Sequence, residues 1–424
     1  MPASLRETRR FPPAARCFLI CVNLRQPRAP KIGLANVHDI GCVHVIVNKE
    51  VFMNKRSLTG FQLEQALAAK LGELLGQAQW LRGWEVQPMD GPHVGFDLLV
   101  ALPLAGGGKA ALCVECKSEL RPSQFSQLTG RHFSPPGKFK QVVPVLALPW
   151  VSPRLQDLCR EHGWSWFDLA GNHRLDVPDF LLLLRSGNEP VHERPRATAN
   201  LSTPEAGRIL RALLLPDNAG MGWTQREMQN HCQPKVSLGL VNKVVRHLQD
   251  EAFIEKSDDG FRLREPLKLL FAWREAYRFD RHERRSYFTL LQGKKLRDAL
   301  AELGLQTGGF AFYASFSAAE FQAPHVRQPK TWLFVRQQEI GKFEKLTEAK
   351  LVHSGENIVV LIPDDDGVFY FGDGGMMGEK RLACTNAVQT YVDLWHSGGR
   401  GQEGADALLE QKLKPEWKVR GMKL

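Results

Sequence analysis

Cysteine is scarce in this sequence, and long apolar runs are absent. Eight cysteines are spread irregularly over 424 residues, which excludes the closely spaced disulfide framework of small secreted domains. No apolar run reaches the roughly 18 residues that cross a bilayer, and the apolar run at residues 17–22 is too short for the core of a signal peptide. There is also no internal repeat and no low-complexity tract. These shortages predict a cytoplasmic protein without a membrane partner.

The length and the charge of the chain indicate several domains and an anionic partner. A chain of 424 residues is too long for one compact core, so we expect two or three domains. Lys and Arg number 56 against 46 Asp and Glu, which gives a formal net charge of +10. Such an excess favours a polyanion, because neutralised phosphates release condensed counterions. Charge that serves only solubility is the alternative.

The two ends of the chain differ in composition from the rest. Residues 1–52 hold clusters of Arg and Pro without clear periodicity, and a helical pattern begins soon after Met53. We therefore expect a disordered or misassigned extension over 1–52 and hypothesise that translation begins at Met53. A basic arm that contacts phosphate is the alternative. Residues 416–424 are predicted to form a basic tail.

Residues 53–186 carry the pattern of an α/β domain. Apolar residues at helical spacing predict helices over 59–76 and 152–162. Short apolar runs separated by turn residues predict strands at 94–100, 110–117, 142–148, 164–168 and 180–184. A mixture of strands and helices of this length is typical of one α/β domain. The polar, proline-containing stretch over 187–203 is predicted to be a linker.

Residues 204–266 have the pattern of a winged helix-turn-helix. Thr203 and Pro204 begin a first helix, and Thr224 with Glu227 forms a capping box that begins a second. A third helix over 237–251 carries an apolar stripe made of Val241, Val244, Val245 and Leu248. The Asp259-Gly260 pair then predicts a hairpin turn between two short strands. Three helices followed by a hairpin is the order of a winged helix.

The face of the third helix opposite its apolar stripe is polar and basic. On such a face Arg and Lys can address guanine edges, Asn can address adenine, and Gly239 would let backbone approach phosphate. The predicted DNA-binding residues are Ser237, Gly239, Asn242, Lys243 and Arg246 on the helix, with Lys256, Arg262 and Arg264 on the hairpin. Because Asp258 and Asp259 at the hairpin tip would repel phosphate, a protein-binding winged helix is the alternative.

A second constellation, in the first domain, has the spacing of a nuclease site. Asp97 lies in one predicted strand, and Glu115 and Lys117 lie in the next, where alternation places both on one face. Two carboxylates could hold Mg²⁺ while the lysine steadies charge on a phosphate, and Glu64 could add a further acid. This spacing resembles the PD-(D/E)xK nuclease core. Exposed acids and lysines without a function, or an inactive scaffold of the same fold, are the alternatives.

Cys113 and Cys116 overlap this motif but do not predict chemistry of their own. On a strand, two thiols at this spacing would face opposite sides of the sheet. Thiols on opposite faces can form neither a redox pair nor a zinc site, and no second Cys/His pair has zinc-ligand spacing. Asp168, before the Gly171-Asn172 pair, is expected to cap a turn.

Residues 267–415 predict a third, C-terminal α/β domain. A basic helix is expected over 267–287, and its spacing would place Arg274, Arg278, Arg281 and Arg285 on one face. That face would extend a phosphate footprint or dock the domain, and a solvated helix face is the alternative. Strands are expected at 331–335, 357–361 and 368–371, with helices at 387–395 and 403–413.

Several stretches together resemble one family of regulators. They are residues 152–154, 167–172, 316–319, 323–326, 366–370, 391–395 and 399–401, in addition to the winged helix. Over residues 58–413 the chain is similar to the AbiEi antitoxins and transcriptional regulators of type IV toxin–antitoxin systems. One departure is that a nuclease-like domain here precedes the winged helix, which in this family usually lies at the N-terminus.

The resemblance implies a protein that binds double-stranded DNA at its own operator and opposes a nucleotidyltransferase-like toxin. That function needs no cofactor. The alternative is a Mg²⁺-dependent endonuclease that its winged helix directs to DNA. The expected architecture is α/β throughout: a restriction-endonuclease-like α/β domain, a central winged helix-turn-helix and a C-terminal α/β domain.

Overall fold

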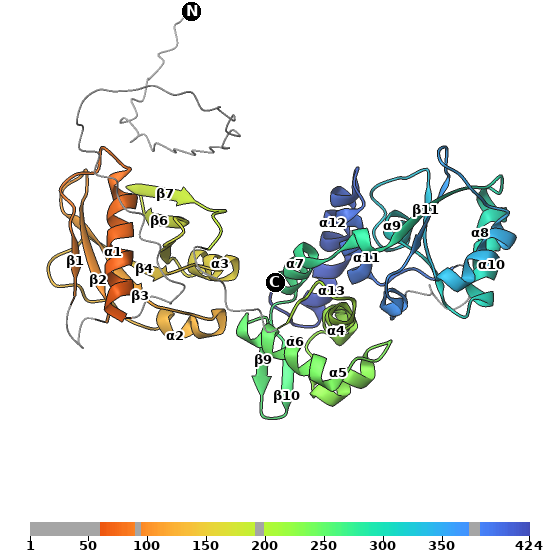
Figure 1. The fold of residues 1–424 in the computed structure, drawn as a ribbon, viewed down its shortest axis with the longest axis horizontal. Helices are drawn as coiled ribbons and strands as arrows, with labels where there is room; N and C mark the ends of the chain where they lie inside the picture. The colour runs from red at the N-terminus through yellow and green to blue at the C-terminus, as the bar shows by residue number, and fades with distance from the viewer. Residues whose placement is uncertain (1–59, 90–94, 191–198, 373–381) are drawn as a thin grey trace, which may run out of the picture. The chain divides into compact units, whose positions relative to one another are not determined.

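The computed structural model describes residues 60–89, 95–190, 199–372 and 382–424. The chain is mixed α/β and divides into two compact units, Met1–Pro195 and Arg196–Leu424, which are described separately (Figure 1). The predicted extension over 1–52 and the hypothesised start at Met53 lie outside the described residues. Within those residues, no helix has both the length and the apolar character needed to span a membrane.

The first unit is built on a seven-stranded sheet whose spatial order follows the chain, from β1 to β7. Its strands are β1 (Val86–Pro88), β2 (Leu98–Pro103), β3 (Lys109–Cys116), β4 (Gln141–Leu148), β5 (Ser165–Asp168), β6 (His173–Val177) and β7 (Leu181–Arg185). The three central strands, β3, β4 and β5, run parallel, and the outer pairs are antiparallel. Its helices are α1 (Gly60–Gly76), η1 (Pro122–Gln124), α2 (Ser126–Thr129) and α3 (Pro153–Glu161).

Helices cover both faces of this sheet. The leucines of α1 pack on the face that includes Val114 and Cys116, and α1 crosses the sheet in Figure 1. The opposite face is covered by α2 and α3, through Phe125 and Leu155. Strand alternation separates Cys113 from Cys116 as predicted, since they lie in different core clusters, and burial raises the pKa of Cys113 to about 12.

Most elements predicted for the first unit are confirmed. The helix predicted over 59–76 is α1, and the predicted strands correspond to β2, β3, β4, β5 and β7. The sequence pattern does not predict β1, β6 or the short α2. Strand β6 has the sequence HRLDV, in which polar residues interrupt the apolar pattern that marks the other strands.

The second unit begins with three helices and a small antiparallel sheet. These elements are α4 (Pro204–Leu214), η2 (Pro216–Asn218), β8 (Gly222–Trp223), α5 (Gln225–His231), α6 (Leu238–Asp250), β9 (Ile254–Ser257) and β10 (Gly260–Leu263). The three predicted helices and the hairpin are present, and the side chains of Thr203, Thr224 and Ser237 cap the helices. The sheet has the order β8-β10-β9, so β8 adds a strand that the sequence analysis did not predict.

A glycine makes this third strand possible. Gly260 begins β10 with φ at 146°, and a Cβ added there would lie 2.2 Å from the carbonyl oxygen of Trp223 in β8. Any side chain would therefore push the two strands apart. The close approach of β8 to the hairpin depends on this residue.

The rest of the second unit is a five-stranded sheet between helices. Its elements are α7 (Pro266–Ala276), η3 (Phe279–Arg281), β11 (Glu283–Phe288), α8 (Gly293–Gln306), β12 (Ala311–Tyr313), α9 (Ser315–Gln322), β13 (Thr331–Val335), η4 (Gln337–Glu339), α10 (Ile340–Thr347), β14 (Lys350–Leu351), β15 (Ile358–Ile362), η5 (Asp366–Phe369), α11 (Ala387–His396), α12 (Gly401–Leu408), the π-helical turn η6 (Leu409–Leu413) and α13 (Lys414–Val419). The strand order is β12-β13-β15-β11-β14. Helices α8 and α10 lie on one side of β11 and helices α9 and α11 on the other (Figure 1).

The basic helix predicted over 267–287 is wrong beyond Ala276. Helix α7 ends there, and residues from Glu283 form β11, which pairs with β15. The arginines therefore do not share one face. Arg278 pairs with Asp280, and Arg285 pairs with its strand neighbour Glu283. Pairing with a distant strand overrides the local helical pattern here.

Arg274 is the one member of that set that stays on α7. Its guanidinium lies 3.7 Å from the ring centre of Trp395, and it donates to the hydroxyl of Tyr391 at 3.0 Å. It is thus used to dock α7 on α11. The strand predicted at 368–371 is also wrong, because the 3₁₀ helix η5 occupies residues 366–369.

The end of the chain is not the basic tail that its composition predicted. Residues 414–419 form α13, and Trp417 is completely buried. Its indole donates to the carbonyl oxygen of Leu214 at 3.0 Å, which joins α13 to α4. Residues from α4, α6 and the hairpin share one continuous core with α11 and α13.

Candidate nucleic-acid interface

Helix α6 presents one apolar and one polar face. Val241, Val244 and Leu248 are fully buried, at 0% exposure, and with Val245 they hold one side of the helix in the core. At the N-terminus the hydroxyl of Ser237 accepts a hydrogen bond from the backbone N–H of Leu240 at 3.2 Å. Because the apolar stripe fixes the rotation of the helix, the opposite side must face outward.

The outward side of α6 carries free positive charge. Lys243 and Arg246 are exposed, and no ion pair or hydrogen bond engages either group within the described ranges. Gly239 lies on the same side, with open space where a side chain would be. The predicted face is thus assembled by the fold, and its cations are available to a ligand.

Asn242 differs from the other residues of this face. It is half-buried, and its amide donates to the side chain of Gln225 at 3.3 Å. Gln225 is the first residue of α5, which begins at the capping box of Thr224 and Glu227. Hydrogen bonds within this box lower the pKa of Glu227. Asn242 therefore links α6 to α5, and reading a base would require it to exchange that contact.

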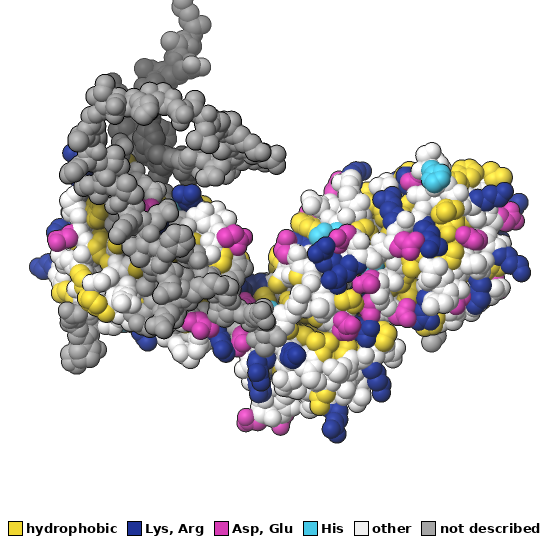
Figure 2. All heavy atoms as spheres, viewed as in Figure 1, with side chains coloured by type: hydrophobic (Ala, Val, Ile, Leu, Met, Phe, Trp, Pro, Cys, Tyr) yellow, Lys and Arg dark blue, Asp and Glu magenta, His cyan; other side chains and the backbone are white. Residues whose placement is uncertain are grey.

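The hairpin adds further cations beside the helix. Lys256, Arg262 and Arg264 are exposed, and none of them forms an ion pair with another described residue. Arg262 lies opposite Glu255 in the strand register, and Asp258 and Asp259 occupy the tip. Figure 2 shows dark blue side chains around this part of the surface, with magenta at the tip of the hairpin. Positive charge therefore concentrates along the sides of the hairpin.

Two further cations that the sequence analysis did not select lie on the same segment. Arg226 on α5 and Lys235 in the turn before α6 are both exposed. Neither side chain is paired in the part of the chain that the structure describes. Their signal in the sequence was their position, one in the first turn of the second helix and one just before the third.

The nuclease-like residues of the first unit lie together at the ends of β2 and β3. Leu98 pairs with Val114, so Asp97, one residue earlier, lies beside Glu115. The carboxylate of Asp97 accepts a hydrogen bond from the backbone N–H of Cys116 at 2.6 Å. Lys117 lies on the same side as Glu115, as predicted, with its ammonium 2.5 Å from that carboxylate.

Arg131 completes this cluster, and the sequence analysis missed it. Its guanidinium donates to the same oxygen of Glu115 at 2.9 Å. Glu115 is only 2% exposed, so its negative charge is held between two cations. Arg131 lies sixteen residues further along the chain, two residues past the end of α2. No sequence motif connects residues at that separation, so the sequence gives no sign of this contact.

The further acid that the sequence suggested, Glu64, does not join this cluster. Glu64 lies on α1, which packs against the Cys116 face, whereas Glu115 points to the other face of the sheet. Among the residues that the structure describes, no three His, Cys, Asp or Glu side chains gather as a metal site would require. Both carboxylates are instead engaged by protein donors. The arrangement acts as an internally neutralised ion-pair cluster.

Asp168 caps a turn, as predicted. It is fully buried, and its carboxylate accepts hydrogen bonds from the backbone N–H groups of Val151 and Asn172 and from the amide of Asn172. Burial raises its pKa, although these donors favour the charged form. The motif therefore has a structural role.

No family model, no curated protein and no solved structure matches this chain.

Proposed function

We propose that this protein is a DNA-binding transcriptional regulator that reads duplex DNA with α6 and the hairpin of β9 and β10. One observation carries the proposal. The outward surface of this segment presents five cations that have no partner among the described residues, Lys243, Arg246, Lys256, Arg262 and Arg264, while the reverse side of α6 is buried in the core. Unpaired surface cations of this kind can neutralise phosphates and release their counterions.

The order of the elements supports the same function. Helices α4, α5 and α6 followed by the hairpin is the order of a winged helix, in which the third helix enters the major groove. Arg246 and Lys243 then face guanine edges, and the N-terminus of α6 approaches a phosphate. The hairpin cations contact the neighbouring backbone and fix the register of the protein on the duplex.

We further propose that the regulated operon is its own, as in AbiEi-type antitoxins that oppose a nucleotidyltransferase-like toxin. The support is the resemblance over residues 58–413, which includes the segment that packs against α4, residues 366–370. Autoregulation requires only that the operator lie upstream of the gene. The toxin need not contact this chain.

A titration of the full-length protein tests the DNA-binding function. A fluorescent duplex from the region upstream of the gene and a random duplex of equal length are each titrated across a series of salt concentrations. Affinity for both should fall steeply as salt rises, since phosphate contacts release counterions, and the upstream duplex should bind more tightly. A winged helix that binds only proteins would show no salt-sensitive affinity for either duplex.

A metal-dependent nuclease with a restriction-endonuclease-like fold is the second candidate. It is favoured by the placement of Asp97 beside Glu115 and Lys117. Incubation of the protein with plasmid and Mg²⁺, beside the Glu115→Gln variant, decides between the two. Cleavage that the variant loses would support the enzyme. Intact plasmid under all conditions would support a scaffold role for the first unit.

A further inference from the structure

A segment of the C-terminal part of the second unit is linked to both ends of the connection between α5 and α6, directly at one end and through Arg208 of α4 at the other. We call residues 365–371 the clamp segment. It begins after β15, includes η5 and ends in a turn at Tyr370 and Phe371. None of its residues belongs to the proposed DNA-reading surface.

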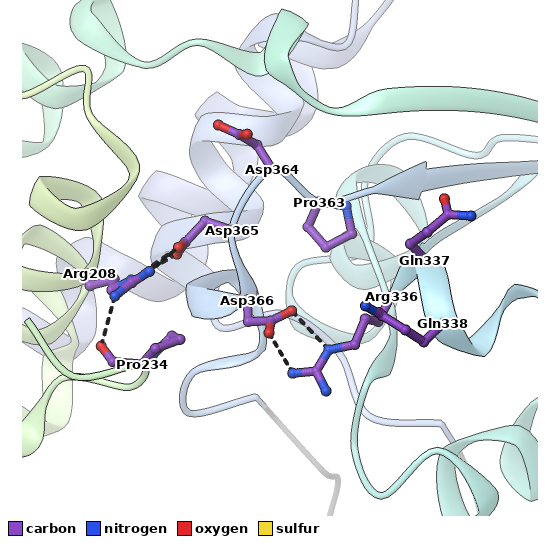
Figure 3. A pocket seen from close by; sticks show the side chains of 9 residues that line it. All are labelled: Arg208, Pro234, Arg336, Gln337, Gln338, Pro363, Asp364, Asp365 and Asp366. Carbon is purple, nitrogen blue, oxygen red and sulfur yellow. Dashed lines mark hydrogen bonds and ion pairs between the residues drawn. The ribbon is translucent and has the colours of Figure 1, made fainter.

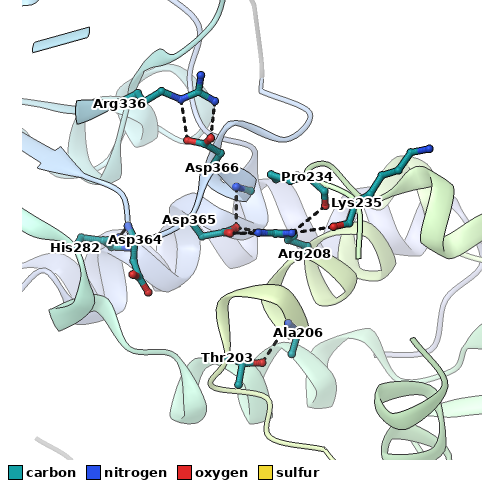
Figure 4. A network of polar contacts seen from close by, with 11 residues as sticks. Thr203, Ala206, Arg208, Pro234, Lys235, His282, Arg336, Asp364, Asp365 and Asp366 are labelled. Atoms are coloured by element: carbon teal, nitrogen blue, oxygen red, sulfur yellow. Dashed lines mark hydrogen bonds and ion pairs between the residues drawn. The ribbon is translucent and has the colours of Figure 1, made fainter. Parts of the chain in front are cut away.

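Arg208 of α4 joins the clamp segment to the turn before α6. Its Nε donates to both carboxylate oxygens of Asp365 at 3.1 Å, and a second nitrogen pairs with the same group. Its third nitrogen donates to the carbonyl oxygens of Pro234 and Lys235, at 3.3 and 3.0 Å (Figure 4). One planar guanidinium thus binds both partners in a fixed, forked geometry that a lysine ammonium does not have.

The carboxylate of Asp365 is itself held in place. It accepts a hydrogen bond from the backbone N–H of Gly367 at 2.8 Å. Its side chain is only 9% exposed, and that of Arg208 is 14% exposed. A charge-assisted pair that is shielded from water in this way is stronger than one at the open surface.

The other end of the connection is held by aromatic contacts. His231 is the last residue of α5, and its ring stacks on Phe371 with centroids 5.2 Å apart. Tyr370 meets the same ring edge-on with centroids 5.7 Å apart, and the ring of Trp223 in β8 lies 4.8 Å from it in a tilted arrangement. The turn between α5 and α6 is therefore fixed by the clamp segment at both ends.

We infer that the clamp segment is a positioning element that sets the orientation of α6 against DNA and thereby determines how well the protein distinguishes sequences. This inference rests on the proposed function. The carbonyls that Arg208 binds lie two and three residues before Ser237, the cap of α6. Bidentate contacts to bases depend on exact alignment, so a small shift of this turn would weaken them strongly. Contacts of flexible lysines and arginines to phosphate tolerate the same shift better.

A neighbouring ion pair supplies a matched control. Asp366, the next residue, pairs with Arg336 at the end of β13 and does not contact the turn (Figure 3). Both pairs line the same pocket of about 450 Å³. A variant of Asp366 therefore removes a similar charge from the same pocket without touching Arg208.

The test compares Asp365→Asn and Asp366→Asn in the full-length chain. A tight-binding duplex is first selected from a randomised pool with the wild-type protein, and a random duplex of equal length serves as reference. Asp365→Asn should reduce the ratio of the two affinities on the order of tenfold, the worth of one aligned base contact. Affinity for the random duplex and its salt dependence should stay within about twofold. Asp366→Asn should leave the ratio unchanged.

Two further measurements keep the test decisive. Arg208→Lys retains the charge but loses the forked geometry, so it should lower the ratio as well. Amide hydrogen exchange should become faster at residues 236–240 in Asp365→Asn and not in Asp366→Asn. An unchanged ratio, an equal loss on both duplexes or unchanged exchange would each overturn the positioning role. Absence of salt-sensitive binding by the wild-type protein would instead refute the proposed function.

Discussion

Under the proposed function, single residues determine whether the surface of α6 recognises a base or only a phosphate. Arg246 is exposed, unpaired within the described residues and held at the centre of the outward face by the buried valines behind it. Replacement by Ala should lower affinity for a selected duplex by about 1–3 kcal/mol and relax the preference at one base pair. Fluorescence anisotropy titrations measure both effects.

A control for this variant lies elsewhere in the same unit. Lys294 in the first turn of α8 is also exposed and unpaired in the described structure. Lys294→Ala should bind like the wild type. If Arg246→Ala and Lys294→Ala are indistinguishable, Arg246 does not face the groove.

Lys256 on the hairpin should act through phosphate alone. It is exposed on β9, away from the predicted base-reading face. Lys256→Ala should weaken binding to all sequences alike and reduce the slope of log affinity against log salt by about one. A change in sequence preference, with the salt slope unchanged, would assign it to a base instead.

At the residue scale, the sequence indicates which side chains of a helix face outward, but not which side chains contact one another. The apolar stripe from Val241 to Leu248 determined which residues of α6 face outward, because helical periodicity is a local property. It did not show that Asn242 donates to Gln225, or that Arg131 reaches Glu115. Those contacts depend on how separate elements meet, and no spacing in the chain encodes them.

At the scale of elements, α13 is held to α4 by one large side chain. Trp417 is fully buried and donates to the carbonyl of Leu214. Trp417→Ala should lower the free energy of unfolding by about 3–5 kcal/mol, through lost burial and the cavity left behind. Urea denaturation followed by circular dichroism measures this change. Val419→Ala, at a site that is 86% exposed, should change it little.

A buried polar network joins α4, α7 and α11 and should make stability depend on pH. Asp393 of α11 accepts hydrogen bonds from Tyr277 and Gln389, at 2.8 and 2.7 Å. Its second carboxylate oxygen has no partner among the described residues. Burial raises the pKa of Asp393 from 3.8 to about 7.

The sign of the effect follows from this shift. Between about pH 4 and 7 the folded protein keeps a proton on Asp393 that the unfolded chain releases, so this contribution to stability is lost as pH rises through that range. Asp393→Asn cannot titrate, so its unfolding free energy should fall less than that of the wild type from about pH 5 to about pH 8. Parallel curves for the two proteins would show that Asp393 is already ionised when folded.

His282 in the same network has the opposite dependence. Burial lowers its pKa to about 4, so acid favours the unfolded chain, where this histidine binds a proton. It is present in both proteins, so its contribution is removed when the two curves are subtracted.

Elements with a strong local pattern were predictable, and elements defined by distant pairing were not. The leucines of α1 and the apolar run of β4 mark their elements without reference to the rest of the chain. The residues of β11 have a local pattern that predicts the end of a helix, and their strand character depends on pairing with β15, where Tyr287 lies opposite Ile358. Strand β8 has only two residues, and it can pair with β10 because Gly260 has no side chain to clash with Trp223.

At the scale of the whole molecule, the sequence indicated the α/β class and the order of the segments. It treated residues 204–266 and 267–415 as separate domains, whereas the structure places them in one unit with a shared core. The reason is visible in α4, where Ile209, Leu210 and Leu213 are buried together with Arg211. A helix buried on nearly every side requires neighbours on every side.

That burial determines what can be transplanted. In a chimera that carries only residues 204–266, α4 would lose its contacts with α11 and α13. Leucines and an arginine of α4 that are buried in this protein would then be exposed to solvent. Such a graft should aggregate whatever its DNA sequence preference. An engineer who wants the proposed DNA-reading surface on another protein must move the entire Arg196–Leu424 unit.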